Sequence, residues 1–111
     1  MTPEGKVKQI VRIFLHSRRV YPAAGKEWDS KILGLGWYYM PVQNGMGVTG
    51  IHDFIGCYKG RFFSIETKAI GKDLTENQIG RRREIELAGG HTFVVREAAD
   101  LQSLDDWMRM L

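Results

Sequence analysis

Two acidic residues and a lysine are spaced so that one β-hairpin would bring them together. Lys59 and Gly60 separate two β-favouring segments, and a two-residue turn there would set Asp53 directly opposite Glu66. Lys68 lies two residues past Glu66 and would point to the same face of its strand. Opposed carboxylates have Cβ atoms about 5 Å apart, which costs stability unless they share a proton or a cation. Mg²⁺ would resolve the repulsion, since proteins hold it through one or two carboxylates together with water and phosphate oxygens.

The residues beside the acids are largely apolar on both faces of the predicted hairpin. One face carries Phe54, Phe63 and Ile65, and the face of the acids carries Ile55, Cys57 and Phe62. This predicts a sheet covered on both sides, in which acids in mid-strand are not simply solvated. The alternative is a partly exposed edge hairpin with ordinary surface charges, and the spacing alone leaves both open.

The hairpin needs further elements to position it, and the sequence predicts them. Thr2-Pro3-Glu4 is typical of a helix start, and apolar residues follow at helical spacing. Residues 20–35 show no period and predict a long connection. Strands are predicted over 37–42, 51–58, 61–68 and 91–95, a second helix from Thr75 to Gly89-Gly90, and a last amphipathic helix over 101–111. The order αβββαβα predicts an α/β fold, and the length predicts a single domain spanning residues 1–111.

Five segments follow one another along nearly the whole chain. They are Thr2-Pro3-Glu4, Gly50-Ile51-His52-Asp53, Gly60-Arg61-Phe62-Phe63-Ser64-Ile65-Glu66-Thr67-Lys68, Leu74-Thr75-Glu76-Asn77-Gln78 and Gly89-Gly90. Together they resemble the VRR-NUC family of the PD-(D/E)XK nuclease superfamily. A Glu-X-Lys element alone is weak evidence, but its order and spacing with the preceding Asp and the following Gln are more specific. The resemblance implies a restriction-endonuclease-like core, a mixed central sheet flanked by helices.

The resemblance also implies roles for individual residues. Asp53 and Glu66 would bind the metal, with the Thr67 carbonyl as a further candidate ligand, and Lys68 would orient or activate the attacking water. Glu4 would act near the metal through water, and Gln78 would form a hydrogen bond at the active site. The chemistry is hydrolysis of a phosphodiester assisted by Mg²⁺ or Mn²⁺, which lowers the pKa of the water and takes up charge in the transition state.

Three of these assignments have structural alternatives. The proline that usually precedes the first acid is His52 here, and strand alternation places His52 on the face opposite Asp53, which predicts a structural change rather than a lost ligand. Glu4 suits the N-terminal turn of any helix and could pair with Lys8. Gln78 could close a capping box with Thr75, and the two roles compete for one amide.

Basic and aromatic residues supply candidate contacts to nucleic acid. Lys6, Lys8, Arg81 and Arg82 are the candidate phosphate ligands, and a solvated helix face is the alternative for all four. Trp28, Trp37, Tyr38 and Tyr39 could stack on unpaired bases, although aromatic residues in a small domain more often belong to the core. The glycine pattern over 45–50 leads into a strand rather than a helix, which excludes a dinucleotide site. A histidine-based metal site is unfavourable because the three histidines are scattered.

Composition narrows the class of protein further. The chain has 111 residues, a formal charge of +3 and a single cysteine, which excludes an internal disulfide and a zinc cluster of cysteines. With no hydrophobic leader, we expect a cytoplasmic protein without a membrane segment, in a bacterium or a phage-infected host.

The sequence therefore predicts a divalent-metal DNA endonuclease acting on branched, Holliday-junction-like DNA. Symmetric cutting of two strands needs two active sites, which predicts a C₂ homodimer. The alternatives are an inactive nucleic-acid-binding module of the same fold and a phage protein-interaction domain.

Overall fold

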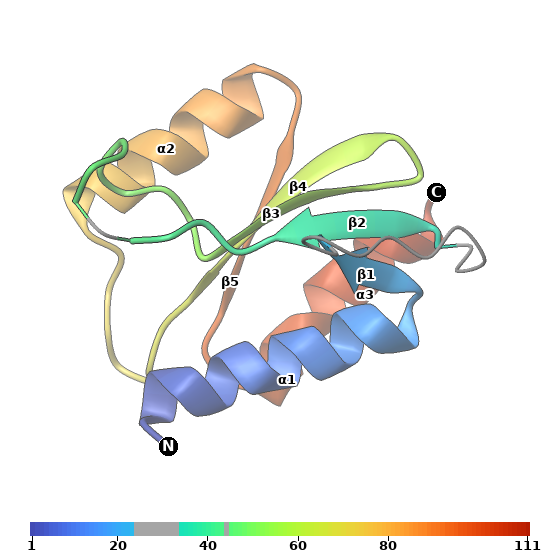
Figure 1. The fold of residues 1–111 in the computed structure, drawn as a ribbon, viewed down its shortest axis with the longest axis horizontal. Coiled ribbons are helices and arrows are strands. Elements are labelled where there is room, and N and C mark those ends of the chain that lie inside the picture. Colours follow the sequence, from blue (N-terminus) through green and yellow to red (C-terminus); the bar gives the residue numbers. More distant parts are fainter. Residues whose placement is uncertain (24–33, 44) are drawn as a thin grey trace.

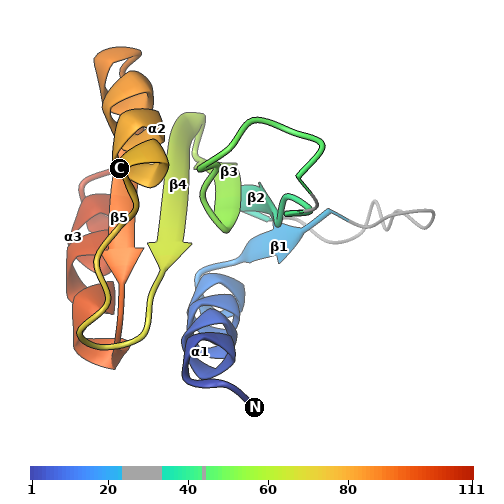
Figure 2. The ribbon, with the colours of Figure 1, turned by 90° about the vertical axis from the view of Figure 1, so that its left-hand side faces the viewer.

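A computed structural model describes residues 1–23, 34–43 and 45–111. The described residues form three layers, in which one mixed sheet lies between α1 and α3 on one side and α2 on the other (Figures 1 and 2). The elements are α1 (Pro3–Ser17), β1 (Val20–Pro22), β2 (Gly36–Tyr39), β3 (Phe54–Tyr58), β4 (Arg61–Thr67), α2 (Glu76–Leu87), β5 (His91–Val95), the 3₁₀ turn η1 (Ala98–Asp100) and α3 (Leu101–Arg109). The strands lie in the sheet in chain order. β3 is antiparallel to both β2 and β4, whereas the edge strands β1 and β5 are parallel to their neighbours β2 and β4. The predicted α/β class with a mixed sheet and flanking helices is confirmed.

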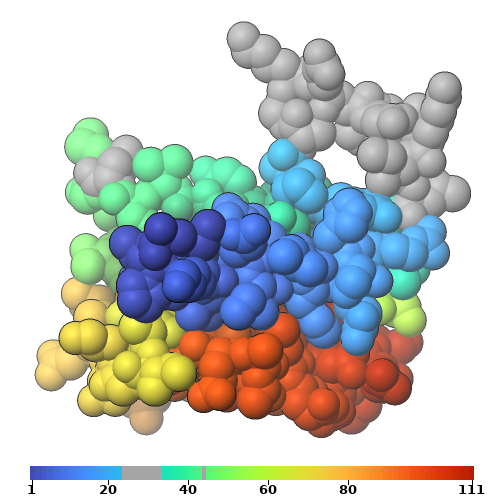
Figure 3. All heavy atoms as spheres, turned by 90° about the horizontal axis from the view of Figure 1, so that it is seen from below, coloured from blue at the N-terminus to red at the C-terminus, as the bar shows by residue number. Residues whose placement is uncertain are grey.

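One face of the sheet carries the apolar core. Val11 and Leu15 of α1, Phe63 of β4 and Leu104 of α3 are fully buried in one cluster, and the Trp107 ring contacts Phe63 edge-on. Figure 3 shows α1 beside the segment that contains η1 and α3 on this side of the molecule. The amphipathic patterns of both terminal helices therefore predicted the correct covering of this face.

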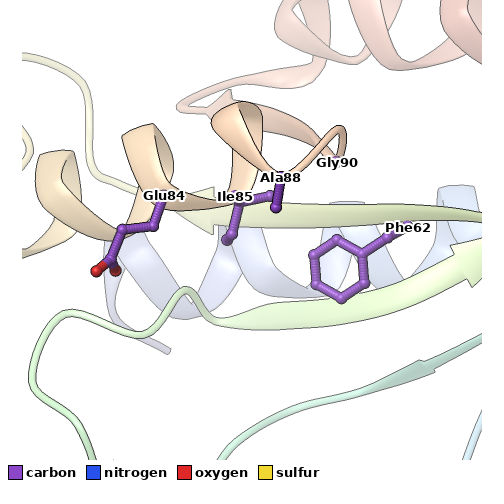
Figure 4. Close-up of a pocket in the computed structure, with 5 residues that line it drawn as sticks. All are labelled: Phe62, Glu84, Ile85, Ala88 and Gly90. Carbon is purple, nitrogen blue, oxygen red and sulfur yellow. The ribbon is translucent and has the colours of Figure 1, made fainter.

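The opposite face is covered only in part, so the prediction of a sheet covered on both sides is wrong for half of it. Beneath α2, Ser64 and Glu66 are buried. Away from α2, Cys57 and Trp37 (47%) are exposed, and Phe62 beside the end of α2 is 42% exposed. Phe62 and four residues at the end of α2 and just beyond it line a cavity of about 390 Å³ (Figure 4): Glu84, Ile85, Ala88 and Gly90. This cavity lies at the start of β4, whereas Glu66 lies near its end.

Three predicted boundaries need correction. Val20–Pro22 is a strand rather than part of a connection, pairing in parallel with β2, and Val20 is fully buried. A three-residue strand that ends in proline is too short for period analysis to detect. β2 ends at Tyr39, two residues before Pro41, and β3 begins only at Phe54. Residues 24–33, including Trp28, and residue 44 lie outside the described residues.

The turn between β3 and β4 is tight and sets the predicted register. Lys59 has φ 47° and Gly60 has φ 81°, and both positive values match the two-residue hairpin turns whose twist suits the strands. Tyr58 pairs with Arg61 and Phe54 with Ile65, as a turn at Lys59 and Gly60 requires. Lysine is a poor residue for this conformation, and its backbone N–H donates to the Leu35 carbonyl at 2.8 Å, which helps to hold it.

Gly50 lets the chain before Asp53 touch the first turn of α2. It has φ 86°, and a Cβ placed on it would lie 2.4 Å from the carbonyl carbon of Asn77. The last glycine of the 45–50 pattern is therefore needed for packing rather than for binding a phosphate. It fixes the distance between the start of β3 and α2.

We expect Gly50→Ala to lower the free energy of unfolding by about 2 kcal/mol or more, because of the clash with Asn77 and the left-handed backbone. Gly47→Ala is the matched control, since Gly47 in the same loop has open space and an ordinary φ. Urea unfolding measures both variants, and equal stability of the two would contradict this explanation.

Candidate metal centre

Three carboxylates from distant parts of the chain meet at one end of the sheet. Glu4 lies in the first turn of α1, Asp53 immediately precedes β3, and Glu66 lies near the end of β4. One carboxylate oxygen from each lies within 4.8 Å of the other two. Figure 2 looks toward this end of the molecule, where the starts of α1 and α2 and the end of β4 face the viewer.

Asp53 is held in place by Thr67. Its Oδ2 accepts hydrogen bonds from the Thr67 backbone N–H at 3.0 Å and from the Thr67 hydroxyl at 2.6 Å. Regular pairing ends at Phe54 and Ile65, so Asp53 meets Glu66 beyond the ladder rather than as the predicted opposed pair. The Thr67 side chain therefore positions an acid, and ligation by its carbonyl stays a prediction.

Glu66 is the most buried member of the cluster. It is 2% exposed; its Oε1 accepts a hydrogen bond from Gln78 at 3.2 Å, and its Oε2 is buried without a hydrogen-bond partner. Burial raises the pKa of Glu66 to about 8, helped by the charge of Asp53 and by the hydrogen bond that a protonated Glu66 would donate to Asp53, against the opposing charge of Lys68. Without a cation, a proton on Glu66 therefore relieves the repulsion.

Gln78 forms both of the hydrogen bonds that the sequence placed in competition, and its role at an active site stays a prediction. Its Oε1 accepts a hydrogen bond from the Thr75 backbone N–H at 2.9 Å, which completes the capping box of α2. Its Nε2 donates to Glu66. The expected conflict is wrong, because one end of the amide accepts while the other donates. The capping box thus aims the amide at the acid.

His52 is a structural link, as predicted. Its Nδ1 lies 2.7 Å from Ser64 Oγ and its Nε2 lies 3.1 Å from the Gln78 carbonyl oxygen. Ser64 and Thr67 point to opposite faces of β4, so His52 and Asp53 contact opposite faces, in agreement with the alternation argument, although β3 itself begins only at Phe54. Burial lowers the pKa of His52, which favours the neutral ring.

The predicted basic residues lie in three places: Lys8 and Lys68 near the acidic cluster, Lys6 on the surface of α1, and Arg81 and Arg82 on α2. Lys68 is partly buried directly after β4, and Lys8 Nζ lies 3.8 Å from Asp53 Oδ1. Lys6 is exposed. Arg81 donates to the Thr49 carbonyl at 3.3 Å. Arg82 Nε donates to both Glu86 and Thr92 at 2.9 Å, a contact that ties α2 to β5.

Sequence reasoning missed the contacts that hold the acids in place. The Thr67 hydroxyl and the ion pair of Lys8 were not predicted to lie at the cluster. Nor was the Ser64 hydroxyl predicted to contact His52. Only the position of Lys8 could have been predicted from the sequence, because Lys8 follows Glu4 by one helical turn and lies on the same side of the helix. The hydroxyl contacts depend on strand ends that no periodicity specifies.

Comparison with known protein families, with curated proteins and with solved structures finds no match to this chain. Among the described residues, no helix has the length and apolar character needed to cross a membrane.

The raised pKa of Glu66 predicts a distinctive pH dependence of stability in EDTA. The ordinary carboxyl pKa of 4.5 applies to the unfolded chain, so between that value and about 8 the folded chain binds the extra proton. The stabilisation is complete below pH 4.5 and is lost as the pH rises through 8. Relative to Glu66→Gln, wild type should lose up to about 1.4 kcal/mol per pH unit in this window.

Urea unfolding at stepwise pH measures this loss. Glu97→Gln, which alters an exposed carboxylate, is the control and should follow wild type. Parallel pH curves for wild type and Glu66→Gln would contradict the raised pKa.

Proposed function

We propose that the protein is a divalent-metal-dependent DNA endonuclease of the VRR-NUC type. The observation that carries the proposal is the buried Glu66 Oε2, which lacks a hydrogen-bond partner inside a cluster of three acids. A buried, unpartnered carboxylate oxygen costs stability, and a cation is the ligand that would offset this cost.

The donor set fits Mg²⁺ or Mn²⁺. Carboxylate oxygens are hard ligands, and three of them leave positions for water and for a phosphate oxygen. Asp53 and Glu66 would hold the ion, with Glu4 as a direct or water-mediated ligand. The ion would supply a water of lowered pKa and would neutralise charge on the phosphate.

The chain's own residues would prepare the site for a phosphodiester. Thr67 keeps Oδ2 of Asp53 occupied and so fixes which oxygen faces the ion. Gln78 orients Glu66. Lys68 carries a positive charge that acts on Glu66. The same charge would orient the attacking water. The N-termini of α1 and α2 also lie at this end of the sheet, and their dipoles favour an anion (Figure 2).

Branched DNA is the proposed substrate class, and it rests on the resemblance rather than on the site. Trp37 and Tyr39, with nearly parallel rings and exposed side chains, offer surfaces for unpaired bases on the open face of the sheet. An inactive binding module of the same fold is the second candidate, because the exposed Trp37 and Tyr39 rings would bind unpaired bases without a metal ion.

We expect cleavage of labelled four-way junction DNA in Mg²⁺ or Mn²⁺ and none in EDTA. Glu66→Gln and Lys68→Ala should each slow cleavage by about 10²-fold or more, whereas Glu97→Gln should cut at the wild-type rate. Flap and duplex substrates tested in parallel would rank the preferred structure. Cleavage of no substrate, with DNA binding that is unchanged by metal, would contradict the enzyme and favour the binding module.

A homodimer would place two such sites on one junction. Small-angle scattering should therefore give about twice the 12.7 kDa mass of one chain. The mass of a single chain would contradict the dimer and leave the nuclease proposal standing.

A further inference from the structure

We propose that Lys8 is a built-in counter-ion of the acidic cluster, which neutralises Asp53 when no divalent cation is bound and is displaced when one binds. The inference rests on the proposed function, because it concerns the cation held by the same three carboxylates. It assigns to Lys8 a role in setting the affinity for metal, beyond a general contribution to DNA binding.

The geometry places the Lys8 ammonium where the cation would otherwise interact. Nζ lies 3.8 Å from Asp53 Oδ1, while the other oxygen of this carboxylate is occupied by Thr67. Oδ1 is therefore the Asp53 oxygen left for a metal, and it is the oxygen that Lys8 faces. Lys8 also lies one helical turn after Glu4, so its side chain rises from the same side of α1.

Burial makes this ion pair different from an ordinary surface pair. The Asp53 side chain is 10% exposed, so its charge is weakly screened by water. The Lys8 side chain is 33% exposed, and its flexible stem allows the ammonium to move outward into solvent. The acid is thus fixed while its partner can leave, which is the arrangement that an exchangeable counter-ion requires.

A divalent cation and the Lys8 ammonium would compete for the same charge. Two cations beside one carboxylate oxygen repel each other, so binding of the metal includes the cost of moving Lys8 away. Removing the charge of Lys8 should remove this cost. The affinity for metal should then rise, which is the opposite of what loss of a structural contact would do to the site.

The test is calorimetric titration of MnCl₂ into wild type, Lys8→Met, Lys8→Arg and Lys6→Met at one pH. We expect Lys8→Met to bind Mn²⁺ about threefold to tenfold more tightly than Lys6→Met, the control that removes an exposed charge from the same helix. Lys8→Arg keeps the charge and should stay within about twofold of wild type. Lys8→Gln repeats the neutral substitution without adding apolar surface.

Unfolding in EDTA and in MnCl₂ gives a second readout that does not depend on activity. A tighter site gains more stability from the same metal concentration, so the shift in unfolding midpoint should be larger for Lys8→Met than for Lys6→Met. Equal affinities for these two variants, or weaker binding by Lys8→Met, would overturn the inference. Binding of Mn²⁺ with the expected Lys8 effect but without DNA cleavage would overturn the proposed function alone. Failure of every variant to bind Mn²⁺ would overturn both.

Discussion

The repulsion among three carboxylates, one of them almost fully buried, is the constraint on which the site end of this structure depends. Glu4, Asp53 and Glu66 come from a helix, a strand start and a strand end. The hairpin register brings Asp53 and Glu66 together, whereas Glu4 reaches them only through the packing of α1. Asp53 and Glu66 are each matched by a specific contact or charge nearby. Thr67 donates twice to Asp53, Gln78 donates once to Glu66, and Lys8 supplies a compensating charge. One oxygen of Glu66 stays without a hydrogen-bond partner, and the proposal of a metal ion follows from that imbalance.

The second helix is held to the sheet by polar contacts rather than by a core. None of its residues is buried, in contrast to α1 and α3. Two hydrogen bonds attach it, one between the His52 ring and the Gln78 carbonyl and one from Arg82 to the Thr92 hydroxyl. The close approach of Gly50 to Asn77 is the third contact. These contacts determine where the Gln78 amide points. The position of a candidate active-site group therefore depends on hydrogen bonds whose strength changes with hydration and pH more than apolar packing does.

The two faces of the sheet thus serve different purposes. The face beneath α1 and α3 holds the apolar core. The other face buries Glu66 at one end, against the first turn of α2, and exposes aromatic side chains toward β2. A small domain with one covered face can present a site and an open surface on the same side, which is the arrangement that a long substrate would need.

The sequence by itself determined the elements whose signals are local. The Thr2 cap, the Thr75 to Gln78 capping box, the turn at Lys59 and Gly60 and the register of the hairpin follow from residue types a few positions apart, and the structure contains all of them. The hairpin register was also sufficient to predict that Asp53 and Glu66 meet.

Only the tertiary structure decided which groups surround those acids. Where strands end and how α1 lies against the sheet decide four features. They are the short strand at Val20, the hydrogen-bond partners of His52, the Thr67 hydroxyl on Asp53 and the approach of Lys8. These features involve contacts between residues far apart in the chain, and strand ends are set by such packing rather than by periodicity. The burial that raises the pKa of Glu66 has the same origin, because desolvation depends on the whole surrounding fold.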